Sequence, residues 1–244
     1  CFGCYIFIYL PWFFYLEKKI TMETPNLHII NNAIDDMIPF CVYFIIPYML
    51  WFIYVIGACI YMLFKASDTE FLRFALCLTI GMSVSLLICM IYPSGLTLRP
   101  NDVPDNFFGM LLNTIYASDT PTNVFPSIHV YNSLAVHIAL HRSEWFQKHK
   151  AFDIASLILC VSICMSTVLL KQHSITDVIG ASILMAVMYT LVYATDYSRL
   201  LKKAATRKLK CSKFKKQPLE PDYRKMVSCG CFFLYNNSFD RKVS

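Results

Sequence analysis

The stretch Ser166-Thr-Val-Leu-Leu-Lys-Gln-His-Ser-Ile-Thr-Asp177 separates two apolar runs in the second half of the chain. Each run has the length and composition expected of a membrane-spanning helix. His173 and Asp177 are four residues apart, so on a helix they share one face. A carboxylate there can accept a hydrogen bond from one ring nitrogen of the histidine and leave the other free to react. An ionisable pair between two spans predicts a functional site, and the alternative is a helix cap with a satisfied histidine.

The composition of the whole chain indicates a membrane protein. Of its 244 residues, 57% are hydrophobic and 16% are charged, and the mean hydropathy is +0.49. Water-soluble domains carry more charge, about 25%. Several apolar runs exceed the ~18 residues that cross a bilayer. The sequence therefore predicts an all-α fold, a polytopic bundle of about six transmembrane helices.

The expected spans are 1–15, 38–64, 74–92, 125–140, 154–170 and 178–194. Because the first run is short, we expect its span to be truncated in this sequence. The run 125–140 has the weakest hydropathy, since it contains Ser127, His129, Asn132, Ser133 and His137. Four prolines in residues 93–123 predict a loop there. We divide the chain into a transmembrane domain, 1–196, and a basic cytoplasmic tail, 197–244.

The tail sets the predicted orientation. Nine Lys or Arg residues lie between Arg199 and Lys216 with no acid among them, and a basic block after a span marks the cytoplasmic side. Alternation then places the segments 65–73 and 142–150 inside, and 17–36 and 93–123 outside. We expect a multi-pass protein of the cell membrane with both termini in the cytoplasm. The plainer interpretation is a topology signal in a solvated tail, and the alternative is that the basic block also contacts anionic lipid headgroups.

Three polar segments of the sequence meet at the predicted outer face. Arg99-Pro100 follows the third span, Pro126-Ser-Ile-His129 opens the fourth, and Lys171 precedes His173 between the fifth and sixth. Pro126 suits the first turn of a helix. This would place Ser127 and the neighbouring amides at a helix N-terminus, which favours an anion.

These side chains suit phosphoryl transfer through a histidine. We expect His173 to attack phosphorus, Asp177 to hold its ring, and His129 to protonate the departing oxygen. Arg99 and Lys171 would bind phosphate oxygens. The plainer alternatives are that Arg99 snorkels to the interface, that Lys171 and Ser127 cap helices, and that His137 is a packed interior histidine.

In order and spacing, these residues resemble the type-2 phosphatidic acid phosphatase superfamily, which includes the vanadium haloperoxidases. That family carries the blocks Lys-x6-Arg-Pro, Pro-Ser-Gly-His and Ser-Arg-x5-His-x3-Asp. The corresponding blocks here are Arg99-Pro100, Pro126-Ser-Ile-His129 and Ser166-Thr167-x5-His173-x3-Asp177. The resemblance implies the same helical fold and a reaction without cofactor or metal. It also implies His173 as nucleophile, Asp177 as its orienting carboxylate, His129 as general acid, and Arg99 and Ser127 as phosphate ligands.

Three positions depart from the family pattern. Tyr92 stands where the lysine is expected, Ile128 replaces the glycine, and Thr167 replaces the arginine. The resulting motif forms are similar to the branch that contains inositol phosphoceramide synthase, which moves a phospho-headgroup onto a lipid hydroxyl. A phosphodiester carries less charge than a terminal phosphate, so fewer cations would suffice, and Lys171 would replace one of them.

The predicted function is that of a metal-independent lipid phosphatase or phospho-headgroup transferase with an extracytoplasmic active site. Its substrate would be a membrane lipid phosphate, and no nucleic-acid partner is expected. Two alternatives remain. One is a non-catalytic lipid-binding or transport protein on the same fold. The other is a metal-dependent hydrolase with His129, His173 and Asp177 as ligands.

Overall fold

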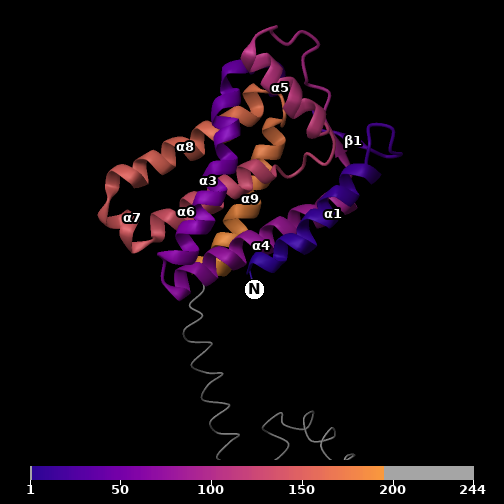
Figure 1. Cartoon of the computed structure of the whole chain (residues 1–244). Coiled ribbons are helices and arrows are strands. Elements are labelled where there is room, and N and C mark those ends of the chain that lie inside the picture. Colours follow the sequence, from indigo (N-terminus) through magenta and orange to yellow (C-terminus); the bar gives the residue numbers. More distant parts are fainter. Residues whose placement is uncertain (1, 195–244) are drawn as a thin grey trace, which may run out of the picture. The chain divides into compact units, whose positions relative to one another are not determined.

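The computed structural model describes residues 2–194, and the predicted basic tail lies outside the described residues. The described range is mostly helical (Figure 1). Its helices are η1 (Phe2–Tyr5), α1 (Ile6–Lys19), α2 (Ala33–Met37), η2 (Val42–Phe44), α3 (Ile45–Phe64), α4 (Asp68–Ile91), α5 (Phe107–Ser118), α6 (Ile128–Arg142), α7 (Glu144–Lys148), α8 (Lys150–Leu169), α9 (Ile175–Tyr189) and η3 (Thr190–Ala194).

Four helical segments are long and apolar enough to cross a membrane: Val42–Phe64, Asp68–Ile91, Lys150–Leu169 and Ile175–Ala194. Their length and composition indicate a multi-pass membrane protein, as the sequence predicts. The other two predicted spans correspond to α1 and α6, which have 14 and 15 residues. A membrane-spanning helix needs ~20 residues at 1.5 Å each, so the count of six stays a prediction.

The outward faces of the long helices are apolar. Large hydrophobic side chains are exposed along α3, α8, α9 and η3, namely Ile46, Ile53, Ile56, Ile60, Leu63, Ile154, Leu157, Ile158, Val161, Ile179, Ile183, Val187 and Leu191. A soluble domain seldom exposes so large an apolar surface. Lipid acyl chains are as apolar as these side chains, so the exposed faces suit a bilayer.

Helix α6 lies at the centre of the bundle, where it packs against α3, α4, α8 and α9. Its residues are buried or half-buried from Ile128 to Leu140. Polar side chains are therefore shielded from lipid by other helices, and the Ser133 hydroxyl donates to the carbonyl of His129 at 2.7 Å. This position explains why the predicted span 125–140 has the weakest hydropathy.

A glycine permits the close approach of α4 to α6. The ring of Tyr131 is fully buried, and its hydroxyl donates to the carbonyl of Cys77 at 2.7 Å. A Cβ atom at Gly81 would lie 1.9 Å from that hydroxyl oxygen. The two helices can pack at this spacing because Gly81 has no side chain.

The two segments that the sequence places outside lie together in the structure. Strands β1 (His28–Ile29) and β2 (Ser94–Gly95) pair in parallel, with His28 opposite Ser94 and Ile29 opposite Gly95. The Glu17 carboxylate accepts from the Thr120 hydroxyl at 2.5 Å and from the Asn123 amide at 2.9 Å. These contacts put both predicted outer segments at one end of the bundle.

Among the differences from the predicted elements, two lie in segments that were expected to be a link or a loop. Helix α4 begins at Asp68 instead of residue 74, because Ser67 and Glu70 form a reciprocal capping box in what was predicted to be a charged link. The predicted loop 93–123 contains helix α5, whose first turn is capped by the Asn106 side chain accepting from the Gly109 amide at 2.9 Å. The prolines that suggested a loop lie on either side of α5.

The packing at Gly81 generates a stability prediction. Gly81→Ala should destabilise the protein by about 1–3 kcal/mol, because the new methyl group overpacks against the Tyr131 ring. The measurement is the thermal unfolding midpoint in detergent. The matched control is Gly57→Ala in α3, where a Cβ would meet nothing within 4 Å. Equal midpoints for the two variants would contradict the packing account.

Candidate active site

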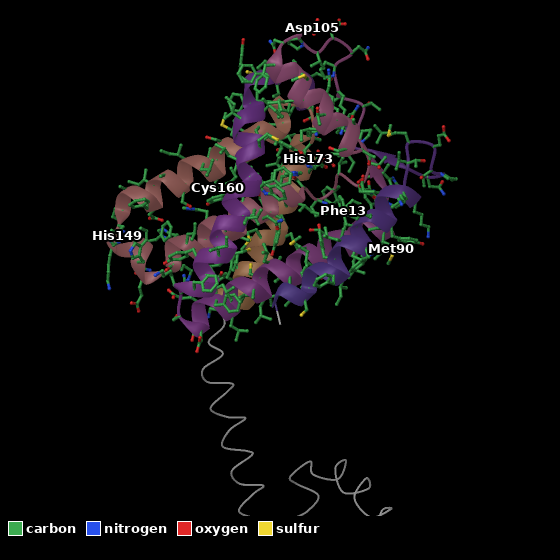
Figure 2. The ribbon with its side chains drawn as sticks, in the orientation of Figure 1. Phe13, Met90, Asp105, His149, Cys160 and His173 are labelled. Atoms are coloured by element: carbon green, nitrogen blue, oxygen red, sulfur yellow. The ribbon has the colours of Figure 1, made fainter. Side chains whose placement is uncertain are left out.

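The end of α8 turns His173 back into the bundle. The Lys171 amide donates to the carbonyl of Val168 at 3.1 Å, and the amides of Gln172 and His173 both donate to the carbonyl of Thr167 at 3.0 Å. Lys171 occupies the left-handed region, with φ 54°. This is the Schellman pattern of helix termination. It brings His173 into the helical body, where the side chain is 8% exposed (Figure 2).

One carboxylate both caps α9 and contacts the histidine. Ser174 is the N-cap residue, and its hydroxyl accepts from the Thr176 amide at 3.1 Å. Asp177 Oδ2 in return accepts from the Ser174 amide at 2.9 Å and lies 3.3 Å from His173 Nδ1. Since a carboxylate oxygen accepts, the proton belongs on Nδ1, and Nε2 of His173 carries the free lone pair.

The start of α6 lies against the start of α9. Ser127 is the N-cap residue of α6, and its amide donates to the carbonyl of Asp177 at 3.4 Å. Pro126 precedes the cap, joined to Phe125 by a cis peptide bond. Pro126 therefore lies just before the helix, and the prediction that it occupies the first helical turn is wrong. Ser127 nevertheless lies at a helix N-terminus.

The rings of the two histidines lie close together where the start of α6 meets the start of α9. The ring centroids of His129 and His173 are 5.8 Å apart. On its other sides, His129 contacts the aromatic rings of Tyr48 and Trp51 in α3, at centroid distances of 4.8 Å and 4.4 Å. The sequence did not indicate that these two aromatic residues contact His129.

Arg99 reaches the same region from the second outer segment. Its guanidinium donates to the carbonyls of Tyr116 and Asp119 at 3.1 Å and 2.6 Å, and to Gln172 Oε1 at 2.6 Å. It also lies over the Tyr116 ring, 4.5 Å from the centroid. Burial lowers the pKa of Arg99, and the nearby Asp119 opposes this shift. Arg99 remains a cation and is connected to the residue before His173.

Lys171 points away from the histidines. Its ammonium group donates to the carbonyls of Asp35 and Ile38, at 2.5 Å and 2.6 Å. The side chain is 9% exposed, and these bonds satisfy a charge that burial would otherwise penalise. The expectation that Lys171 binds phosphate receives no support from this arrangement.

Asp35 is a site-supporting residue that sequence reasoning missed. Its buried carboxylate accepts from the Ser174 hydroxyl at 2.6 Å and from two backbone amides, those of Ile175 and Asn32, both at 2.8 Å. It therefore joins α2 to the N-terminus of α9. Asn32 and Asp35 have the spacing of a capping box. This spacing is the signal in the sequence that could have drawn attention to Asp35.

The three positions that depart from the family pattern do not present cations to the histidines. Tyr92 stacks on His28, with ring centroids 4.0 Å apart. The Thr167 hydroxyl donates to the carbonyl of Cys164 at 2.8 Å. Ile128 occupies the first turn of α6. Among the predicted phosphate ligands, Arg99 is thus the cation that is bonded to the residue before His173.

Other groups fit structural roles or lie apart from the site. His137 Nδ1 lies 3.1 Å from the Ser156 hydroxyl, as suits an interior histidine. Within residues 2–194, no group of three or more His, Cys, Asp or Glu side chains is arranged to hold a metal ion. A cleft of about 680 Å³ borders α5, and none of the site residues lines it.

Fold and site together define a multi-pass helical membrane protein with a histidine pair enclosed by its central helices. The sequence model of one protein family, the PAP2 superfamily, matches residues 70–200. This is more than half of the chain, so the protein belongs to that superfamily. Its members are generally phosphatases or phosphotransferases. No curated protein and no solved structure matches the chain.

The contacts of Asp35 generate a prediction. Asp35→Asn should destabilise the protein by about 1–3 kcal/mol, because an amide nitrogen cannot accept from the donors that the carboxylate satisfies. It should also lower activity by loosening the turn that holds His173. The neighbouring Asp36→Asn is the matched control, since Asp36 is exposed. Unfolding midpoints and turnover measured side by side test this, and equal behaviour of the two variants would contradict it.

Proposed function

We propose that this protein transfers the phosphoryl group or phospho-headgroup of a membrane lipid through a covalent phosphohistidine at His173. The proposal rests on the relative positions of three side chains, those of His173, Asp177 and His129. His173 is held through Nδ1 by Asp177, and its ring lies 5.8 Å from that of His129. A nucleophile with an orienting partner and a second proton-transfer group nearby is the arrangement that covalent catalysis requires.

The first step forms the bond between phosphorus and Nε2 of His173. The bond from phosphorus to the leaving oxygen breaks at the same time, and protonated His129 gives that oxygen its proton. Asp177 stabilises the positive charge that develops on the His173 ring. Arg99, with the amides at the start of α6 capped by Ser127, would bind the phosphoryl oxygens.

The second step reverses the roles of the two histidines. The oxygen of an acceptor hydroxyl attacks phosphorus, and its proton passes to His129, now neutral. The bond from phosphorus to Nε2 breaks and regenerates His173. If water is the acceptor the protein is a hydrolase, a phosphatase where the donor is a phosphomonoester, and if a lipid hydroxyl is the acceptor it is a transferase.

We infer that the donor is a phosphodiester, which carries one negative charge. The structure supports this through the small number of cations, since Lys171 is bonded elsewhere and the side chains of Tyr92 and Thr167 are neutral. The carboxylate of Asp119 also lies close enough to interact with Arg99. The same charge balance supports the inositol phosphoceramide synthase-like branch.

We place the site at the extracytoplasmic rim of the cell membrane. Both predicted outer segments contact the turn between α8 and α9, the first through Asp35 and the second through Arg99. These contacts bring every segment assigned to the outer side to one place. Lipid headgroups at that surface would supply the substrate.

The direct test is turnover of purified protein on a panel of phosphatidate, diacylglycerol pyrophosphate, isoprenyl pyrophosphate and phosphoinositide lipids. His173→Ala and His129→Ala should each lower the rate by about 10²–10⁴-fold or more. His149→Ala is the matched control, because His149 lies at the edge of the helical body, away from His173 (Figure 2). The His149→Ala variant should have the same activity as the parent. Excess chelator should not change the turnover rate of the parent or of any variant.

The identity of the product separates hydrolysis from transfer. Free phosphate or a free phospho-headgroup indicates water as acceptor, and a new phospholipid indicates a lipid hydroxyl. Rapid quenching without acid, followed by mass spectrometry, should find phosphate or phospho-headgroup on His173. No turnover on the panel, with lipid binding unaffected by His173→Ala, would favour a non-catalytic lipid carrier instead.

A further inference from the structure

The region around the histidine pair contains buried N–H groups without hydrogen-bond partners. They are Gln172 Nε2, Arg99 Nε and Trp51 Nε1. Buried donors are normally paired, and leaving one unpaired costs free energy. Arg99 is already a predicted phosphate ligand and Trp51 contacts His129, so the donor that needs an explanation of its own is Gln172.

The orientation of the Gln172 side chain is fixed by Arg99. A guanidinium can only donate, so the atom 2.6 Å from it must be the amide oxygen of Gln172. The amide nitrogen consequently points away from Arg99. Gln172 is 3% exposed, so bulk solvent does not reach that nitrogen.

The Gln172 amide group lies beside Tyr48, a residue that contacts His129. Gln172 directly precedes His173 in the chain, and its side chain lies within reach of the hydroxyl of Tyr48, without a hydrogen bond of ordinary geometry. The Tyr48 ring is in turn 4.8 Å from the centroid of His129, and its hydroxyl already donates to Asp119. The Gln172 donor therefore lies in the neighbourhood of both histidines, close to where a phosphoryl group would be held.

We propose that Nε2 of Gln172 donates a hydrogen bond to a nonbridging oxygen of the phosphoryl group held between His173 and His129. This inference rests on the proposed function and assigns Gln172 as a ligand of the reacting group. Gln172 would supply a neutral donor in a site where Thr167 replaces the arginine of the family pattern. A neutral donor stabilises the oxygen without adding charge, as a singly charged phosphodiester requires.

The test is binding of orthovanadate, an oxyanion that mimics phosphate, to the purified full chain in detergent. Gln172→Met preserves side-chain length and removes the donor. It should raise the dissociation constant about tenfold, the loss expected for one hydrogen bond to a charged group. Gln147→Met is the matched control, because Gln147 is exposed in α7, and its vanadate affinity should not change.

A double-mutant cycle separates direct contact from positioning of Arg99. If Gln172 binds the oxyanion itself, Gln172→Met weakens vanadate binding in the Arg99→Ala background as well. If Gln172 only holds Arg99, the substitution has no effect in that background, and the proposal is overturned. Gln172→Glu adds a second check, because it keeps an acceptor for Arg99 while removing the donor. Undiminished vanadate affinity in this variant would also overturn the proposal.

The outcomes distinguish this inference from the proposed function. Thermal midpoints of each variant show whether it folds, and a misfolded Gln172→Met is replaced in the cycle by the neutral Gln172→Leu. If the parent protein binds vanadate and turns over lipid while the Gln172 variants match it, only the role of Gln172 fails. If the parent shows neither binding nor turnover, the phosphotransfer function fails and the role of Gln172 fails with it.

Discussion

The geometry of the site depends on a reciprocal exchange of hydrogen bonds between α2 and the turn that joins α8 to α9. The ammonium group of Lys171 donates to main-chain carbonyls at Asp35 and Ile38, while the Asp35 carboxylate accepts from Ser174 and Ile175. Both charged groups are buried. A buried charge without partners is strongly unfavourable, so the segments can pack only in the arrangement that satisfies both. His173 lies inside this fixed turn.

The central position of α6 solves a problem specific to membranes. A polar site among helices must be kept from lipid, because polar groups facing the hydrocarbon lack partners. Here α6 carries His129 and its other polar side chains within a ring of α3, α4, α8 and α9. The apolar faces of the surrounding helices meet the bilayer, and Gly81 allows α4 to pack closely enough to complete the enclosure.

Local patterns in the sequence predicted the main features of the fold. Apolar runs located the long helices, whereas the weak hydropathy of 125–140 gave no prediction that this helix is central. The spacing of His173 and Asp177 anticipated their contact, because that contact is made within one turn of the chain. Side-chain direction was harder to predict. Lys171 was expected beside phosphate, but its left-handed backbone conformation directs it to α2.

Long-range contacts account for what the sequence did not reveal. Asp35 lies far from His173 along the chain, and nothing in its local pattern indicates a partner in α9. Tyr48 and Trp51 are one helical turn apart, as many core residues of a span are, and only folding shows that both contact His129. The role inferred for Gln172 likewise depends on its bond to Arg99, which joins segments that the sequence separates.

The central claim is that His173 and His129 hold one phosphoryl group between them. An experimental structure of the protein with orthovanadate bound tests this most directly. The account predicts vanadium bonded to Nε2 of His173, with a vanadate oxygen within hydrogen-bonding distance of His129. Vanadate bound elsewhere at saturating concentration, or the two imidazole rings turned to separate sides of the bundle, would contradict it.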